Sequence, residues 1–138
     1  MTILQLQEKV YKMGEKIDVN KDSELYPYFC QESDIDNRGI SVYINDEGYN
    51  YLSMERGHIN EHIVSKNIDD IVYVIFDSIT FTFAKEYELK NRKMDEDFRR
   101  QLFRKQLELM RCISTKYAEI LESEHNHYLE ISPFRDSK

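Results

Sequence analysis

The sequence predicts an α+β protein: an N-terminal helix, then an antiparallel sheet of three to four strands, then three C-terminal helices packed on one sheet face. Three observations lead to this prediction. Apolar residues recur at helical spacing near the start, strand-like segments follow, and longer helical stripes fill the remainder. Helices and strands that are segregated along the chain are typical of this class. With 138 residues and no repeat or linker, residues 1–138 are expected to form a single domain.

The first helix is expected to begin after Thr2, because Thr2 and Gln5 have the spacing of a capping box. Gly14 weakens this helix without ending it. Five apolar residues share its buried face: Ile3, Leu6, Val10, Met13 and Ile17.

Three segments have the composition of strands, and a short fourth one is expected after them. Pro27 suggests that the first strand lies at a sheet edge or starts late, because proline cannot donate to a neighbouring strand. The four segments are Leu25–Gln31, Gly39–Asn45, Tyr49–Arg56 and 60–65.

The connection between the second and third strands sets the register of the hairpin. A three-residue loop with Gly48 in the left-handed position would place Tyr43 opposite Tyr51. In that register one face carries apolar residues, namely Ile40, Val42, Ile44, Leu52 and Met54. The other face carries Tyr43, Tyr49, Tyr51, Ser53 and Glu55. A two-residue loop would mix apolar and polar residues on both faces, so the three-residue loop is preferred.

The second half of the chain has the pattern of three helices. Ser65 or Asn67 is expected to cap a long helix that continues to about Arg92. A second helix is expected over Asp95–Ile113, and Ser114 is expected to restart a third. Residues 132–138 are expected to fray, with Phe134 as an anchor.

The charge of the chain excludes some partners. Its formal net charge is −7, which disfavours nucleic-acid binding because a phosphate-tracking surface needs an excess of lysine and arginine. The stretch from Asp18 to Asp70 holds 12 acidic residues and only 4 basic ones, so the acidic excess is local. No apolar run has membrane-spanning length and no signal peptide is recognised, so a cytoplasmic location is expected. Cys30 and Cys112 lack the spacing of a zinc or redox pair.

The residues His58, Glu61 and His62 match the H-x-x-E-H pattern of inverted zinc metallopeptidases. That chemistry needs both histidines on one face of a helix, whereas this segment follows Gly57 at a strand end. A small metal-dependent enzyme is therefore only an alternative reading. His125 and His127 lie near the end of the last helix, where histidines suit the carbonyl groups. No cofactor and no catalytic residue is predicted.

Half of the ten tyrosines fall in the strand region, within the most acidic part of the chain. Tyrosine offers a large rigid contact area with a polar tip, so protein interfaces are enriched in it. The same residues could equally pack beneath a helix, and the pattern alone leaves both readings open. The five are Tyr26, Tyr28, Tyr43, Tyr49 and Tyr51.

The segment Tyr49–Gly57 fits a Y-x-Y-x-x-x-E-R-G pattern that resembles the signature of the immunity protein 63 family. The residues of Asp70–Arg92, Asp97–Phe103 and Gln106–Leu109 are similar to the helical half of that family. The resemblance covers most of the chain, up to Phe134. His58–Ser65 cannot be placed in the pattern, so nothing is carried over to that segment.

The resemblance implies an α+β protein that is encoded beside a polymorphic toxin and neutralises it by direct binding. Its partner would be the cognate toxin domain, and many such toxins are nucleases with basic clefts. An acidic surface could then imitate the nucleic-acid backbone. An adaptor module that acts without any toxin is a further alternative, and the oligomeric state is left open.

The residues proposed for toxin contact are Tyr43, Asp46, Glu47, Tyr49, Tyr51 and Glu55. Arg56 and Gly57 are assigned a structural role, with Arg56 expected on the core side of its strand.

Overall fold

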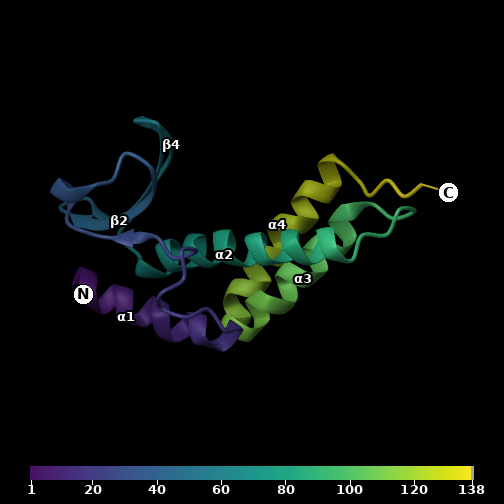
Figure 1. Cartoon of the computed structure of the whole chain (residues 1–138), viewed down its shortest axis with the longest axis horizontal. Coiled ribbons are helices and arrows are strands. Elements are labelled where there is room, and N and C mark those ends of the chain that lie inside the picture. The colour runs from purple at the N-terminus through teal and green to yellow at the C-terminus, as the bar shows by residue number, and fades with distance from the viewer. Residues whose placement is uncertain (138) are drawn as a thin grey trace. The chain divides into compact units, whose positions relative to one another are not determined.

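A computed structural model describes residues 1–137 and confirms the α+β class (Figure 1). The chain divides into two compact units, Met1–Ile75 and the residues from Phe76 onward. The first unit holds the N-terminal helix and the sheet, and the second holds most of the helical half. One continuous helix, α2 (Ile68–Lys90), begins in the first unit and ends in the second.

Helix α1 (Ile3–Gly14) begins as the capping box predicts. The Gln5 amide donates to Thr2 Oγ1 over 3.2 Å, and the Thr2 amide donates to Gln5 Oε1 over 2.9 Å. The helix then tightens into the 3₁₀ turn η1 (Glu15–Ile17). Gly14 is needed there because a Cβ would meet the hydroxyl of Tyr26, which donates to the Val19 carbonyl over 2.9 Å.

The sheet of the first unit has four strands in the order β1-β2-β3-β4. Their bounds are β1 (Tyr28–Phe29), β2 (Gly39–Asn45), β3 (Gly48–Glu55) and β4 (His58–Ser65). The sheet is mixed, because β1 runs parallel to β2 while the other pairs are antiparallel. The predicted strand Leu25–Gln31 shrinks to two residues, since Ser23 holds a turn at Leu25 and η2 (Glu32–Asp34) follows. The fourth strand is longer than predicted.

The predicted register of the β2–β3 hairpin is wrong. Asn45 pairs with Gly48 and Tyr43 pairs with Asn50, so the loop contains only Asp46 and Glu47. Gly48 does not sit in the loop but begins β3, where a Cβ would lie 2.5 Å from the Ser65 carbonyl oxygen. A glycine is therefore needed at position 48 because β3 approaches the end of β4 closely there, and not because of the loop conformation.

The shifted register changes which residues share a face. Val42 and Tyr51 lie opposite each other on one face, named here the Val42 face, with 0% and 3% exposure. Leu52 lies on the other face, named the Leu52 face, and packs there with Tyr43 and Cys30. Both faces carry buried apolar side chains, so the prediction of one apolar face and one tyrosine face fails.

Replacing Gly48 by alanine tests this close approach. We expect Gly48→Ala to lower the free energy of unfolding by about 2–4 kcal/mol, because the new Cβ both clashes with Ser65 and occupies a positive φ. Gly39→Ala is the matched control: Gly39 also has a positive φ, but no atom lies within 4 Å of its Cβ position. Urea unfolding measures both. Equal losses would show that Gly48 is not needed for close approach.

The second unit contains the later turns of α2 together with α3 (Phe98–Ile113) and α4 (Thr115–Ile131). The side chain of Asp97 caps α3 by accepting from the Arg99 amide, and that of Ser114 caps α4 by accepting from the Tyr117 amide. Figure 1 shows α3 and α4 as neighbouring antiparallel helices. The three predicted helices are confirmed, and Asn67 caps α2 by accepting from the Asp69 amide.

A polar network lies in the core of the second unit. Gln106 is 2% exposed, and its Nε2 donates to Asp77 Oδ1 over 2.8 Å and to the Asp77 carbonyl over 3.1 Å. His125 Nε2 meets Gln106 Oε1 at 3.0 Å, and Phe103 stacks on the imidazole at 4.0 Å. Burial lowers the pKa of His125 to about 4. His125 is thus a core residue and not a helix-end surface histidine as predicted.

The buried His125 makes stability depend on pH. The unfolded chain binds a proton near pH 6.5, whereas folded His125 resists it until about pH 4. The contribution of neutral His125 to the free energy of unfolding is therefore fully present above pH 6.5. As the pH falls toward 4, the free energy of unfolding should drop by at most about 3 kcal/mol. Urea unfolding between pH 7 and pH 5, above the range where carboxylates titrate, should show about 2 kcal/mol of this loss.

The variant His125→Gln retains a hydrogen-bond donor but cannot titrate, so its stability should change little over that pH range. His127→Gln is the control, because His127 is exposed on the same helix. This control should keep the wild-type pH dependence. If His125→Gln also keeps it, the account of a neutral buried histidine is wrong.

Residues 132–136 are held against the start of α3 instead of fraying. Arg99 donates to the carbonyls of Ser132 and Pro133, and Arg100 forms an ion pair with Asp136 at 3.0 Å. Phe134 lies under the Arg100 guanidinium at 4.1 Å, so the predicted anchor is confirmed. Residue 138 lies outside the described residues.

Candidate functional site

A hollow of about 560 Å³ lies where η2 meets the β2–β3 turn. It is named here the hairpin hollow, and its lining residues are Gln31, Glu32, Ser33, Ile44, Asn45 and Asp46. Asn45 Nδ2 donates to Glu32 Oε2 over 3.2 Å, which ties η2 to the turn. This contact gathers Glu32 and Asp46 at one end of the sheet.

A chain of polar side chains fixes the β2–β3 turn. Asn45 Oδ1 accepts from the Glu47 amide over 2.9 Å and from Asn50 Nδ2 over 3.0 Å. Asn50 is completely buried, and its Oδ1 lies 2.9 Å from His62 Nε2 on β4. Side chains from three strands therefore hold the main chain of the turn that carries Asp46 and Glu47.

An apolar cluster lies on the Leu52 face beside the polar contact of Asn50 and His62. Cys30, Tyr43 and Leu52 form a buried cluster, and Ile35 and Met54 pack against it. Burial raises the pKa of Tyr43, and the negative charges of Glu32 and Glu47 raise it further. The pKa of the Cys30 thiol is also raised, mainly by burial. Acidic groups thus lie around a weakly solvated tyrosine hydroxyl.

The structure separates the residues predicted for toxin contact into exposed and buried ones. Asp46 and Glu47 are exposed at the turn. Tyr43 and Tyr51 are each only 3% exposed, on opposite faces of the sheet, so they support the strands and offer no contact surface. Tyr49 is half-buried on the Val42 face, opposite Ile44.

Glu32 was not predicted as a site residue, although the structure places it on the rim of the hairpin hollow. The only sequence signal was the acidic segment 32–36, which carries three carboxylates in five residues. Its position over the turn depends on the Asn45 contact, 13 residues away in the sequence. No local pattern predicts such a contact.

Glu55 lies at the opposite end of β3 from Asp46 and Glu47. A strand of this length separates the two turns by about 20 Å, so these residues do not form one site. Arg56 and Gly57 make the β3–β4 turn, with φ angles of 51° and 81°. Arg56 is exposed there, so the expectation that it lies on the core side is wrong.

Arg56 adopts a backbone conformation that favours asparagine or glycine, because both φ angles match a type I′ turn. We expect Arg56→Asn to raise the free energy of unfolding by roughly 0.5–1 kcal/mol. Arg56→Lys is the control and should change nothing, since lysine meets the same backbone strain. Thermal unfolding measures both. No gain in Arg56→Asn would show that the arginine side chain stabilises the turn.

The motif His58, Glu61 and His62 lies on strand β4 and not on a helix. His58 pairs with Glu55 and belongs to the Val42 face, whereas His62 pairs with Leu52 and belongs to the Leu52 face. The two histidines therefore point to opposite sides of the sheet. This geometry does not provide the ligand arrangement of the metallopeptidase pattern. Within residues 1–137, no three histidine, cysteine or acidic side chains are grouped to bind a metal ion.

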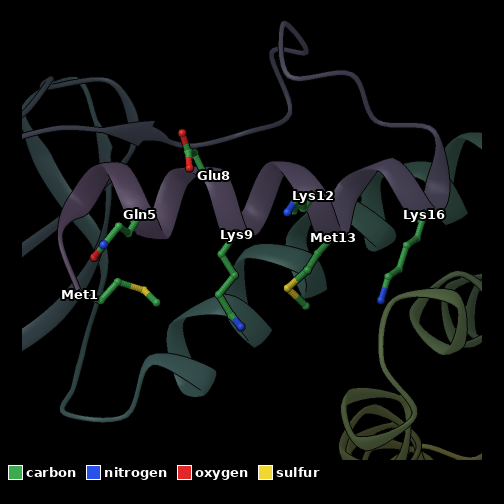
Figure 2. Close-up of a pocket in the computed structure, with 7 residues that line it drawn as sticks. All are labelled: Met1, Gln5, Glu8, Lys9, Lys12, Met13 and Lys16. Carbon is green, nitrogen blue, oxygen red and sulfur yellow. The ribbon is translucent and has the colours of Figure 1, made fainter.

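A second hollow, of about 810 Å³, lies along α1 and has the opposite charge (Figure 2). Three lysines line it together with Met1, Gln5, Glu8 and Met13; they are Lys9, Lys12 and Lys16. Figure 2 shows Lys9, Met13 and Lys16 on one side of the helix, while Glu8 points away. The first unit thus carries a basic helix face as well as the acidic hairpin hollow.

Comparison with family models matches residues 45–127 to Immunity protein 63. The matched segment begins at the β2–β3 turn and includes β3, β4, α2, α3 and most of α4. Neither a curated protein nor a solved structure shows significant similarity to the chain. Among the described residues, no helix is both long and apolar enough to cross a bilayer.

Proposed function

Because the chain belongs to the immunity protein 63 family, we propose that it binds and neutralises a cognate toxin through the acidic rim of the hairpin hollow. The observation that carries this proposal is that Glu32 and Asp46 line the hollow while Glu47 follows Asp46 in the same turn; these three residues are the acidic rim. The family supplies the toxin as the partner. The charges and their geometry supply the surface.

The rim suits a cationic partner. Asp46 and Glu47 are exposed. The nearby Lys66 donates through Nζ to the main-chain carbonyl of Asp46, so this lysine contacts the main chain of the turn. Carboxylates fixed at a surface attract basic side chains and increase the rate of encounter. A turn already held by Asn45 and Asn50 loses little conformational entropy on binding.

Neutralisation then works by occlusion. A toxin that acts on nucleic acid needs a basic cleft for the phosphates, and the acidic rim would occupy that cleft in their place. Such a protein needs no catalytic residue and no cofactor. It would act in the cytoplasm of the cell that produces the toxin, before the toxin meets its target.

Charge reversal at the turn tests the proposed surface. The double variant Asp46→Lys and Glu47→Lys should slow association with the toxin domain encoded beside this chain by about tenfold or more, because electrostatic steering is lost. The measurement is the association rate by stopped flow at several salt concentrations. The salt dependence of that rate should flatten in the variant.

The control is Asp22→Lys with Glu24→Lys, which changes the net charge equally on an exposed segment before β1. Its association rate should stay close to that of the wild type. Equal slowing in both variants would assign the effect to total charge and remove the hairpin hollow as the binding surface. An unchanged rate in the turn variant would do the same.

A further inference from the structure

We propose that strand β4 is a self-association edge, at which a second copy of the chain adds its own β4 in antiparallel orientation. The two edges of the sheet differ greatly. The β1 edge has two residues, whereas β4 has eight and no strand on its outer side in the described chain. The proposal concerns the free protein and does not depend on a toxin.

Strand β4 lacks most of the features that usually protect a sheet edge. It is not short and carries neither lysine nor proline, so the bulge opposite Ser53 is the one such feature it has. It exposes apolar side chains instead: Ile59 is 65% exposed and Val64 is 39% exposed. An exposed edge of this kind is a template for another strand.

The register of the sheet shows which main-chain groups of β4 are free. In the two-residue β2–β3 hairpin, Asn45 and Gly48 form a hydrogen-bonded pair, and bonded and non-bonded pairs then alternate. The Cys30 amide donates to the Val42 carbonyl over 3.0 Å, which agrees with this alternation because Val42 then faces β1. On β3, the groups of Tyr49 and Tyr51 consequently face β4.

The partners of those residues, Ser65 and Ile63, direct their main-chain groups inward to β3. His62 and Val64 therefore direct theirs outward. Asn60 is the extra residue of a bulge, because Ser53 pairs with Glu61 while Met54 pairs with Ile59. Asn60 and Glu61 together oppose one residue of β3, so the main-chain groups of Ile59 also point away from β3.

A two-fold axis perpendicular to the sheet can pass beside His62. His62 then pairs with His62 of the second copy, and the side chains stay on the same face across the new contact. Because the bulge makes Asn60 and Glu61 count as one position, Ile59 and Val64 are equally far from His62 along the strand. Ile59 of one copy therefore lies opposite Val64 of the other, and the two-fold axis produces this pair twice. The two exposed apolar residues of each edge thus cover each other.

The charges of β4 permit this approach despite the net charge of −7. The strand carries one carboxylate, that of Glu61, which lies on the Val42 face. The side chains of Ile59, His62 and Val64 lie on the opposite, Leu52 face. An edge of eight residues buries less than the about 800 Å² per partner of a typical stable complex, so a weak dimer is expected.

Sedimentation velocity over a concentration series tests the proposal on the full chain. The wild type should shift from the monomer mass of 16.7 kDa toward twice that value as concentration rises. Ile59→Lys and Val64→Lys should each abolish the shift, because a lysine at the edge opposes strand pairing. The control Leu4→Lys changes a 67% exposed apolar residue on α1 and should leave the dimer intact.

A cross-link tests the two-fold axis itself. In a Cys112→Ser background, His62→Cys should give a disulfide-linked dimer under mild oxidation, because only a residue at the axis meets its own copy at disulfide distance. Adding Val64→Lys should abolish this cross-link. Circular dichroism confirms that each variant is folded.

A wild type that remains monomeric throughout the series would overturn the proposal and leave the edge for a strand of another protein. A dimer that survives both lysine variants would place the contact elsewhere. A dimer that does not cross-link through His62→Cys would overturn the proposed antiparallel register.

Discussion

The close approach of Gly48 to the Ser65 carbonyl is the constraint on which the first unit depends. It fixes how β3 meets the end of β4, and the two-residue β2–β3 loop just before it fixes the register along β2 and β3. That register buries Tyr43 and Tyr51 on opposite faces and leaves Asp46 and Glu47 at an exposed turn. It also determines which main-chain groups of β4 point away from the sheet. The acidic surface and the free edge are therefore both consequences of the strand register.

The second unit relies on a different kind of constraint, since its core contains charged or polar groups that must be satisfied. Gln106 joins Asp77 of α2 to His125 of α4, and Glu88, only 2% exposed, is paired with Arg92 at 2.8 Å. Breaking one partner of such a buried set leaves the others without hydrogen bonds, which costs more than the bond itself contributes. The contacts of Gln106 therefore specify how α2, α3 and α4 align, whereas the Glu88–Arg92 pair is local to the end of α2.

Local patterns in the sequence predicted the helices well but not the hairpin. The capping box at Thr2 and the cap at Ser114 depend on neighbours within three residues, so they could be recognised directly. The assumption that only one face is apolar led to the wrong register, because both faces of the hairpin carry buried apolar side chains. Asp46 and Glu47 were predicted in the loop, and the structure places both there, whereas Gly48 belongs to β3. Glu32 was missed because its place on the rim depends on Asn45.

The central claim is the two-residue register of β2 and β3, and proton NMR tests it most directly. In antiparallel strands the α-protons of a non-hydrogen-bonded pair lie close together, because the Cα atoms of such pairs approach most nearly. The structure makes Val42 and Tyr51 such a pair, so a strong nuclear Overhauser effect between their α-protons is expected. A strong effect between the α-protons of Val42 and Leu52 instead would establish the three-residue loop and contradict the account.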